Sequence, residues 1–149
     1  MSHLILLLLA FTGGIFLALQ GGLNAQLGVL LRHPLLATVV AFFFSTFFAL
    51  LLAAGQIRQL PSRAVLQQVP VYMWFAGGFC SVVGISLYYY TIPKLGVATM
   101  ISLGLCGQLI FAVVAGHFGW LHLPMEPLTI KKTIGVVAII GGILLINIK

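Results

Sequence analysis

The chain is almost without acid: Glu126 is the only Asp or Glu among its 149 residues, and charged residues of both signs make up 5% of it. Hydrophobic residues make up 62%. Soluble domains have about 25% charged and about 45–50% apolar residues. A chain this apolar could not present a water-facing surface, so the composition excludes a soluble globular protein and predicts an integral membrane protein.

The net charge of +6 comes from this shortage of acid, because the chain has only seven Lys and Arg residues. These basic residues are scattered along the sequence, whereas a nucleic-acid-binding protein gathers them on one face or helix. We therefore expect the lipid bilayer as a partner, and no nucleic acid.

Patterns that carry catalysis or metal binding are also missing from the sequence. It contains no nucleophile–base pair and no phosphate-binding loop, so we expect no catalytic residues and no enzyme activity. Cys80 and Cys106 lie in apolar segments without metal-ligand spacing, and we expect two buried thiols that behave as small hydrophobic side chains. No metal and no cofactor are predicted.

Five apolar segments are long enough to cross a bilayer, which takes about 20 residues of helix. Each must be helical, because lipid offers no partner for the backbone N–H and C=O groups. We predict an all-α, multi-pass bundle that forms one integral membrane domain over residues 1–149. The expected helices cover residues 4–31, 34–55, 71–92, 95–118 and 133–148, and the one long polar interval between them covers residues 56–70.

The orientation of these crossings is nearly undecided. Cytoplasmic loops of membrane proteins usually carry an excess of Lys and Arg, but here one face receives four such residues and the other three. The small excess places the N-terminus in the cytoplasm. The near-tie permits a single orientation, or insertion both ways round that gives antiparallel dimers. The face with the N-terminus has Arg58, Arg63, Lys131 and Lys132, and the other has Arg32, Lys94 and Lys149.

Small residues recur along the predicted helices and let helices approach closely in lipid. In the first segment they stand four residues apart, which aligns them on one side of the helix. We interpret these residues as helix-packing positions rather than ligand contacts. They are Ala10, Gly14, Ala18 and Gly22 in the first segment, Gly77 and Gly84 in the third, and Gly104 and Gly107 in the fourth.

Polar residues inside the predicted spans are the candidates for a solute site, because such groups are costly in lipid and often line a pathway. Gln20 and Asn24 are four residues apart and share a helix face, while Gln108 lies near the centre of the fourth span. Ser86 and Tyr88 lie near the end of the third. An unpaired amide in an apolar medium costs about 2–7 kcal/mol, so these groups either bond to each other between helices or line a cavity. The tyrosines at positions 88–90 also fit an interfacial belt.

No Asp or Glu lies within a predicted span. A proton-coupled exchanger usually needs an intramembrane group that titrates. His117, at the end of the fourth span, is the one candidate for such a group.

Several motifs resemble the YdcZ family of the drug/metabolite transporter superfamily, in an order that covers essentially the whole chain. They are Gly21-Gly22-Leu23-Asn24-Ala25-Gln26-Leu27-Gly28, His33-Pro34, Ile92-Pro93-Lys94-Leu95-Gly96, Gly107-Gln108-Leu109, Gly116-His117-Phe118-Gly119, Gly135-Val136 and Gly141-Gly142. The resemblance implies a five-helix protein of the bacterial inner (plasma) membrane. It also implies movement of small organic solutes by alternating access, often by dimers or duplicated chains.

The chain departs from its apparent relatives at two places. Small multidrug exporters of the superfamily use a glutamate in their first helix, where this chain has Gln20 and Asn24, so their proton–cation exchange is not carried over. YdcZ-like chains commonly have an acid before His-Phe-Gly, where this chain has Gly116.

We therefore expect a transporter of small organic solutes that works as a dimer. Two alternatives stay open: a non-transporting membrane scaffold or accessory subunit, and one half of a heterodimer with a similar chain.

Overall fold

The computed structural model describes residues 3–58, 60–120 and 125–147. Over these residues the chain forms six α-helices, of which five are long and apolar enough to cross a membrane. The predicted all-α fold with five spans is confirmed. The chain divides into two compact units, Met1–Lys94 and Leu95–Lys149, and each is described by itself.

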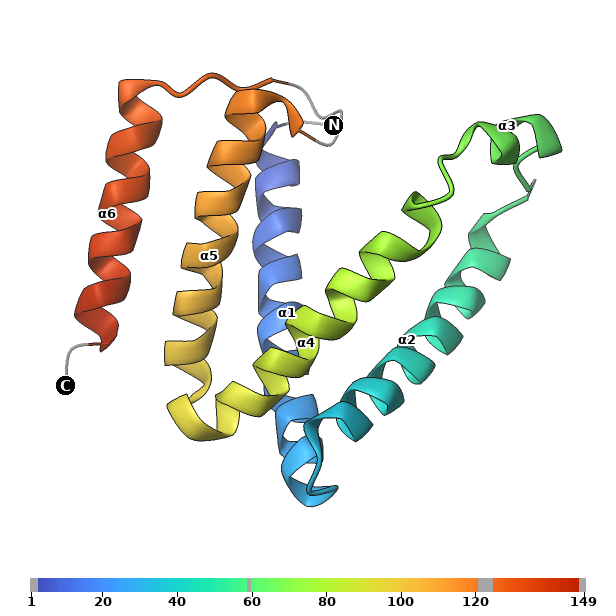
Figure 1. The fold of residues 1–149 in the computed structure, drawn as a ribbon, viewed down its shortest axis with the longest axis horizontal. Coiled ribbons are helices and arrows are strands. Elements are labelled where there is room, and N and C mark those ends of the chain that lie inside the picture. Colours follow the sequence, from blue (N-terminus) through green and yellow to red (C-terminus); the bar gives the residue numbers. More distant parts are fainter. Residues whose placement is uncertain (1–2, 59, 121–124, 148–149) are drawn as a thin grey trace. The chain divides into compact units, whose positions relative to one another are not determined.

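The helices follow the hydropathy of the sequence closely. They are α1 (His3–Leu30), α2 (Pro34–Gln56), the short α3 (Arg63–Gln68), α4 (Met73–Leu95), α5 (Val97–Phe118) and α6 (Ile130–Asn147) (Figure 1). The helix α3 falls inside the interval that we expected to be a polar connection. Ile148, the expected end of the last span, lies outside the described residues.

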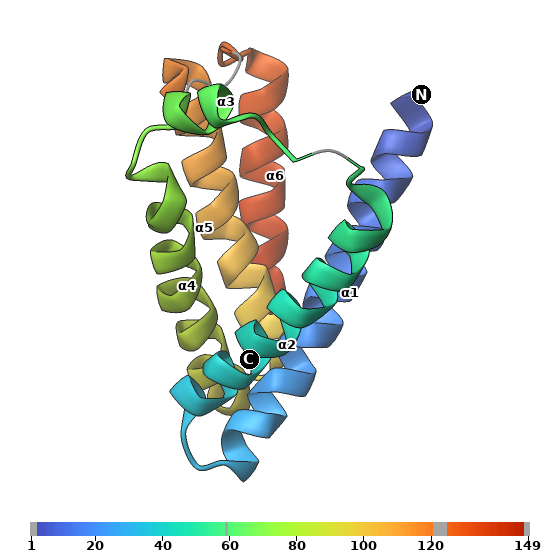
Figure 2. The ribbon, with the colours of Figure 1, turned by 90° about the vertical axis from the view of Figure 1, so that its right-hand side faces the viewer.

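In the first unit, α1 and α2 pack against each other through small residues. Gly21, Ala25 and Gly28 are buried on one face of α1, and Figure 2 shows α2 beside this helix. A Cβ atom at Gly28 would lie 3.4 Å from the Pro34 Cα and 3.5 Å from the Ala37 Cβ. Glycine at position 28 therefore lets the two helices approach closely at their junction.

The turn between α1 and α2 has the hydrogen bonds of a Schellman motif. The Arg32 N–H donates to the Val29 carbonyl and the His33 N–H to the Gly28 carbonyl, each at 3.0 Å. Arg32 has a φ of +54°, in the left-handed region where such turns usually place glycine. Pro34 then begins α2 at a position that suits its fixed φ.

Helix α4 extends further than the sequence suggested. We expected it to end before Pro93, but it continues to Leu95 with the proline in its last turn. The proline has no N–H to donate to the carbonyl of Tyr89 one turn earlier. This loss is tolerated near a helix end because few further backbone bonds depend on it.

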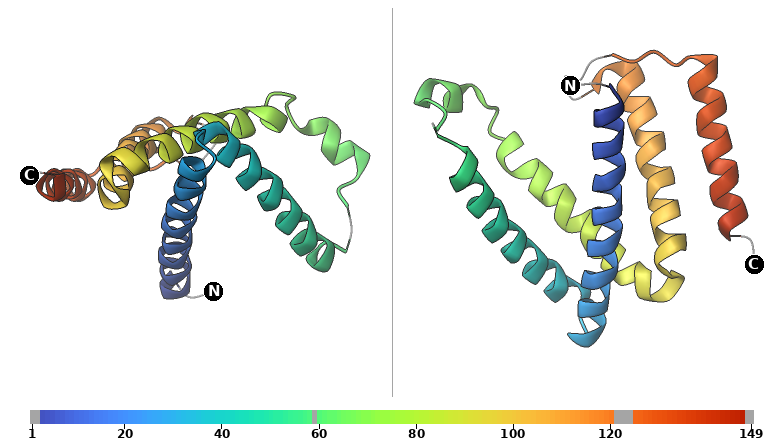
Figure 3. Two further views of the ribbon diagram at one scale, coloured as in Figure 1. Left: turned by 90° about the horizontal axis from the view of Figure 1, so that it is seen from below. Right: turned by 180° about the vertical axis from the view of Figure 1, so that it is seen from behind.

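In the second unit, α5 and α6 lie next to each other, as both panels of Figure 3 show. Helix α5 ends at Gly119, which adopts a left-handed conformation and donates its N–H to the carbonyls of Ala115 and Gly116. The Glu126 N–H also donates to the Gly116 carbonyl at 2.9 Å. The end of α5 is thus tied to the segment that leads into α6.

Large apolar side chains cover the outside of the spans. On α2, Phe43 and Phe48 are 67% and 58% exposed, so aromatic rings are among the side chains on the outside of this helix. Cys106 is partly buried, but Cys80 is exposed, so the expectation of two buried thiols is wrong for Cys80. Its small apolar thiol can face lipid as readily as protein.

Candidate functional site

Asn24 and Tyr89 form a hydrogen bond between two spans of the first unit. The Asn24 Nδ2 of α1 donates to the Tyr89 Oη of α4 at 2.9 Å. The Tyr89 side chain is only 2% exposed, and Asn24 is half-buried. Although the sequence suggested an interfacial belt for these tyrosines, Tyr89 lies inside the helix junction.

A second polar pair links α2 to α4. The hydroxyl oxygens of Thr38 and Ser86 are 3.0 Å apart, and Thr38 also donates to the Pro34 carbonyl at 3.1 Å. A threonine hydroxyl has one hydrogen, so Ser86 donates to Thr38. Helix α4 is therefore joined to both α1 and α2 by neutral side chains.

The other predicted cavity residues are distributed over both units. Gln20 is half-buried on α1, one turn before Asn24, and Tyr88 is half-buried beside Tyr89. Gln108 belongs to α5 in the second unit, where its residue is exposed. A shared cavity of Gln20, Asn24 and Gln108 stays a prediction.

The glycines that make close contacts in the first unit differ from those in the predicted stripes. A Cβ at Gly21 would lie 3.6 Å from the Ile92 side chain, whereas one at Gly14, Gly77 or Gly84 would meet none of the described atoms within 4 Å. Ala10 and Gly14 are exposed on α1 whereas Ala18 and Gly22 are half-buried, and the stripe of these four residues stays a prediction as a packing surface.

In the second unit, a cavity of about 380 Å³ lies between α5 and α6. Its walls are mostly apolar, with Leu109, Val113 and Ile139 among them, and Glu126 and Lys132 are its charged members. A Cβ at Gly116 would lie 3.8 Å from the Glu126 Cβ. The only acidic side chain of the chain thus lies beside Gly116.

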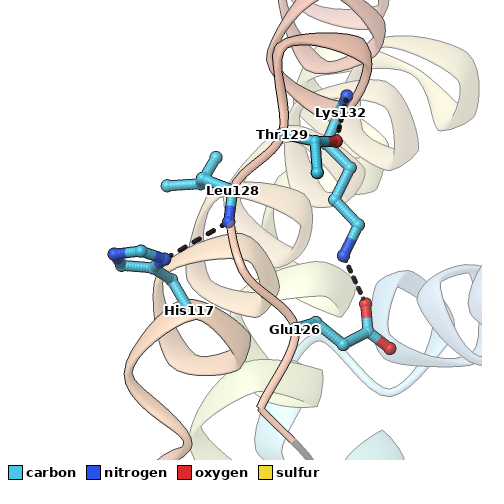
Figure 4. A network of polar contacts seen from close by, with 5 residues as sticks. All are labelled: His117, Glu126, Leu128, Thr129 and Lys132. Carbon is cyan, nitrogen blue, oxygen red and sulfur yellow. Dashed lines mark hydrogen bonds and ion pairs between the residues drawn. The ribbon is translucent and has the colours of Figure 1, made fainter.

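Figure 4 shows the polar contacts at this end of the unit. The Lys132 Nζ lies 2.7 Å from a Glu126 carboxylate oxygen, and this hydrogen bond, reinforced by the lysine's charge, lowers the pKa of Glu126. The His117 Nδ1 accepts the Leu128 N–H at 3.3 Å. His117 is exposed and connects the end of α5 to the following segment.

A further pair joins α5 and α6 at the other end of this unit. The Asn147 Nδ2 lies 3.2 Å from the Ser102 Oγ and donates to the Ile143 carbonyl at 2.7 Å. Neither residue was among the predicted site residues. Asn147 is the last described residue of α6, and its amide is the sequence feature that could have indicated such a contact.

The two polar pairs of the first unit, Asn24 with Tyr89 and Thr38 with Ser86, offer neutral hydrogen-bond donors and acceptors between membrane-spanning helices. Such groups can recognise hydroxyl, amide or amine groups of a solute by hydrogen bonding. Tyr89 and Thr38 are the members that the sequence did not single out. Three adjacent tyrosines could have suggested that one of them faces inward, but the sequence does not say which.

Five apolar spans with buried neutral polar pairs define a multi-pass α-helical membrane protein. Residues 5–145 match the family model described as "Putative inner membrane exporter, YdcZ". The chain belongs to this family, which places it in the inner membrane and among transporters rather than enzymes. No curated protein and no solved structure matches the chain.

Proposed function

We propose that the protein exports small, mostly neutral, hydrogen-bonding organic solutes by alternating access, and that it does so as a dimer. Asn24 and Ser86, with their partners Tyr89 and Thr38, would contact the solute, and Gln20, Tyr88 and Gln108 would line the rest of its path.

The observation that carries this proposal is the hydrogen bond between Asn24 and Tyr89. It links two spans through groups that a solute's own hydroxyl or amine could replace. Exchanging one hydrogen bond for another costs little free energy, because the net value of each is only about 0.5–1.5 kcal/mol. A solute could therefore enter the junction and separate α1 from α4 without leaving a polar group unpaired.

The dimer is supported by how little of each span the chain covers itself. In an apolar stretch of 18 residues from each candidate span, only 6–11% of the residues are buried. Spans with so few buried residues present wide apolar faces, which a second subunit would cover in part. The stripe that contains the exposed Ala10 and Gly14 and the half-buried Ala18 is the surface that we propose for this contact, because small residues allow close helix packing in lipid.

Coupling would not involve an acid within the spans, because Glu126 is the only acid of the chain and precedes α6. Net movement would be facilitated, or coupled through the partner or His117. His117→Asn keeps an acceptor for the Leu128 N–H but removes the imidazole ring. If His117 carries coupling, this variant abolishes the dependence of flux on a pH gradient and leaves downhill flux intact.

The test is flux measured with the purified full-length chain in liposomes, with a panel of neutral and cationic solutes. We expect flux of neutral hydrogen-bonding solutes, and we expect Asn24→Leu to weaken their binding about tenfold, the equivalent of one hydrogen bond. Thr12→Val is the matched control, because Thr12 is exposed and its hydroxyl donates within its own helix, to the Leu8 carbonyl at 2.8 Å.

The outcomes separate this proposal from its alternatives. Absence of flux from a folded, dimeric preparation would favour a scaffold or accessory subunit. Flux that begins only after a similar five-helix chain is added would indicate one half of a heterodimer. A lower unfolding temperature of Asn24→Leu together with unchanged solute binding would show that Asn24 only joins helices.

A further inference from the structure

Two basic residues from separate helices meet at a small cavity of the first unit. Arg32, from the turn after α1, and Lys94, from the last turn of α4, both line a cavity of about 190 Å³. The Lys94 ammonium lies 3.4 Å from the centre of the Tyr90 ring, and Tyr90 lines the same cavity. This cation–π contact keeps the lysine charge at the cavity.

These two charges have no carboxylate in their own unit. Glu126 is the only acid of the chain and belongs to the second unit. Arg32 and Lys94 are also exposed and lie at the ends of membrane spans, at the depth of lipid headgroups. Two cations that line one cavity, with no acid in their unit, attract an anion from outside the protein, and the surface of an anionic bilayer supplies one.

The rest of the cavity wall is apolar or aromatic. Val29, Pro34, Pro93 and the tyrosines form most of it. The volume is below the range of about 300–1,000 Å³ that is usual for pockets enclosing a drug-sized ligand. A small notch with an apolar wall and a cationic rim fits part of an amphiphile, whose polar head meets the charges while its apolar part stays on the helix surface.

We propose that this notch binds the phosphate-bearing headgroup of an anionic phospholipid, with Arg32 and Lys94 contacting the phosphate. The guanidinium of Arg32 can bind a phosphate through two parallel N–H donors, whereas Lys94 acts as a point charge. Arg32 also holds a left-handed conformation with a φ of +54°, which has a free-energy cost for any L-residue other than glycine. Glycine would close this turn without that cost, so the arginine is kept at the turn at the expense of stability.

Because Tyr89 also lines the notch, a bound headgroup would lie directly beside the hydrogen bond from Asn24. The lipid would hold the turn after α1 and the end of α4 together at one membrane surface. This inference does not depend on which solute the protein carries, or on whether it carries one.

The experiment uses the purified full-length chain in an uncharged detergent, with phosphatidylglycerol, phosphatidylcholine and inorganic phosphate as probes. Retained lipid is counted by native mass spectrometry, and thermal unfolding is followed in parallel. We expect phosphatidylglycerol to bind more tightly than phosphatidylcholine and to raise the unfolding temperature. Arg32→Gly and Lys94→Gln should each weaken phosphatidylglycerol binding about fivefold, the usual effect of one basic residue at a membrane surface.

Two features make the variants decisive. Arg32→Gly places the preferred residue in the turn, so its unfolding temperature without lipid should equal or exceed that of the wild type even as lipid binding weakens. Arg58→Gln is the matched control, because Arg58 is an exposed arginine of the same unit that does not line the notch. It should bind lipid like the wild type.

Equal binding of the two lipids would overturn the proposal, as would wild-type binding by Arg32→Gly. Inorganic phosphate that displaces phosphatidylglycerol at equal concentration would show a site for a free anion instead of a lipid. If Lys94→Gln does not fold, Arg32→Gly decides the question alone.

Discussion

The Asn24 amide donates a 2.9 Å hydrogen bond to the hydroxyl of Tyr89, 65 residues later in the chain. The contact places a neutral polar pair between the first span and α4, next to the buried small residues of α1. Both side chains belong to spans in which an unpaired polar group would be costly. Their bond is thus both a structural link and the centre of the proposed solute site.

A double-mutant cycle on this pair should show measurable coupling. Tyr89→Phe removes the acceptor and Asn24→Leu removes the donor, so the double variant should lose less stability than the sum of the two. Hydrogen bonds between membrane helices are worth about 0.6 kcal/mol on average and up to about 1.7 kcal/mol, which sets the expected coupling in the free energy of unfolding. Reversible unfolding in mixed micelles measures it, and strictly additive effects would show that the bond does not form.

Valine at Gly28 should destabilise the first unit strongly, since even a Cβ at this position would lie 3.4 Å from the backbone of Pro34. Overpacking of this kind costs about 1–3 kcal/mol, and the thermal unfolding of the purified chain should fall accordingly.

Gly14→Val is the control for this substitution, because a Cβ at Gly14 meets none of the described atoms. It should leave the fold of the subunit unchanged but weaken the proposed dimer, which light scattering of the detergent complex would detect. A dimer unaffected by Gly14→Val would rule out this stripe as its interface.

The ion pair of Glu126 and Lys132 should give the chain a simple acid titration. Since the lysine lowers the pKa of Glu126, the folded protein binds this proton less readily than the unfolded chain does. The stabilisation is therefore present above the unfolded pKa, about 4.3 for Glu, and is lost as the pH falls through the folded value. Glu126 is the only side-chain carboxylate, so its ¹³C NMR signal reports the pKa directly.

Lys132→Gln should raise that pKa towards the value of a free glutamate, and high salt should have the same effect because the pair is exposed. Lys131→Gln should leave it nearly unchanged. A carboxylate that titrates alike in all three proteins would mean that the ion pair does not form in solution.

The near balance of basic residues predicts that orientation is easy to change. Reporters fused separately to each terminus should find both ends in both compartments if the chain inserts both ways round. Adding two lysines to one connecting segment should then shift the population to one orientation. Reporters that detect one compartment for each terminus would exclude an antiparallel dimer of identical chains.

The hydropathy of the sequence, together with the prolines and polar residues that interrupt it, was enough to predict the spans. The five apolar runs, the helix start at Pro34 and the polar interval before α4 could be identified without any tertiary information. The short helix α3 could not, because its six residues carry no periodic apolar face, and only the capping contact from Ser62 to the Val65 N–H marks its start.

The pairing of polar groups was harder to predict. Tyr88, Tyr89 and Tyr90 are alike in the sequence, yet consecutive helical residues point about 100° apart, so only one of them can face a given neighbour. The structure selects Tyr89 for Asn24. It likewise selects Gly21 and Gly28 over Gly14 for close contacts within the chain, because a stripe of small residues packs only where another helix reaches it.

The amino-acid sequence was sufficient to identify five helices that are long and apolar enough to cross a membrane, because hydropathy and backbone hydrogen bonding within lipid are properties of each segment alone. It also determined that no acid lies in a span. The folded arrangement of the helices was needed to find that Asn24 bonds to Tyr89, that Ser86 bonds to Thr38, and that Arg32 and Lys94 share a notch. Those contacts depend on how each helix is rotated against its neighbours, and the packing of many side chains together sets that rotation.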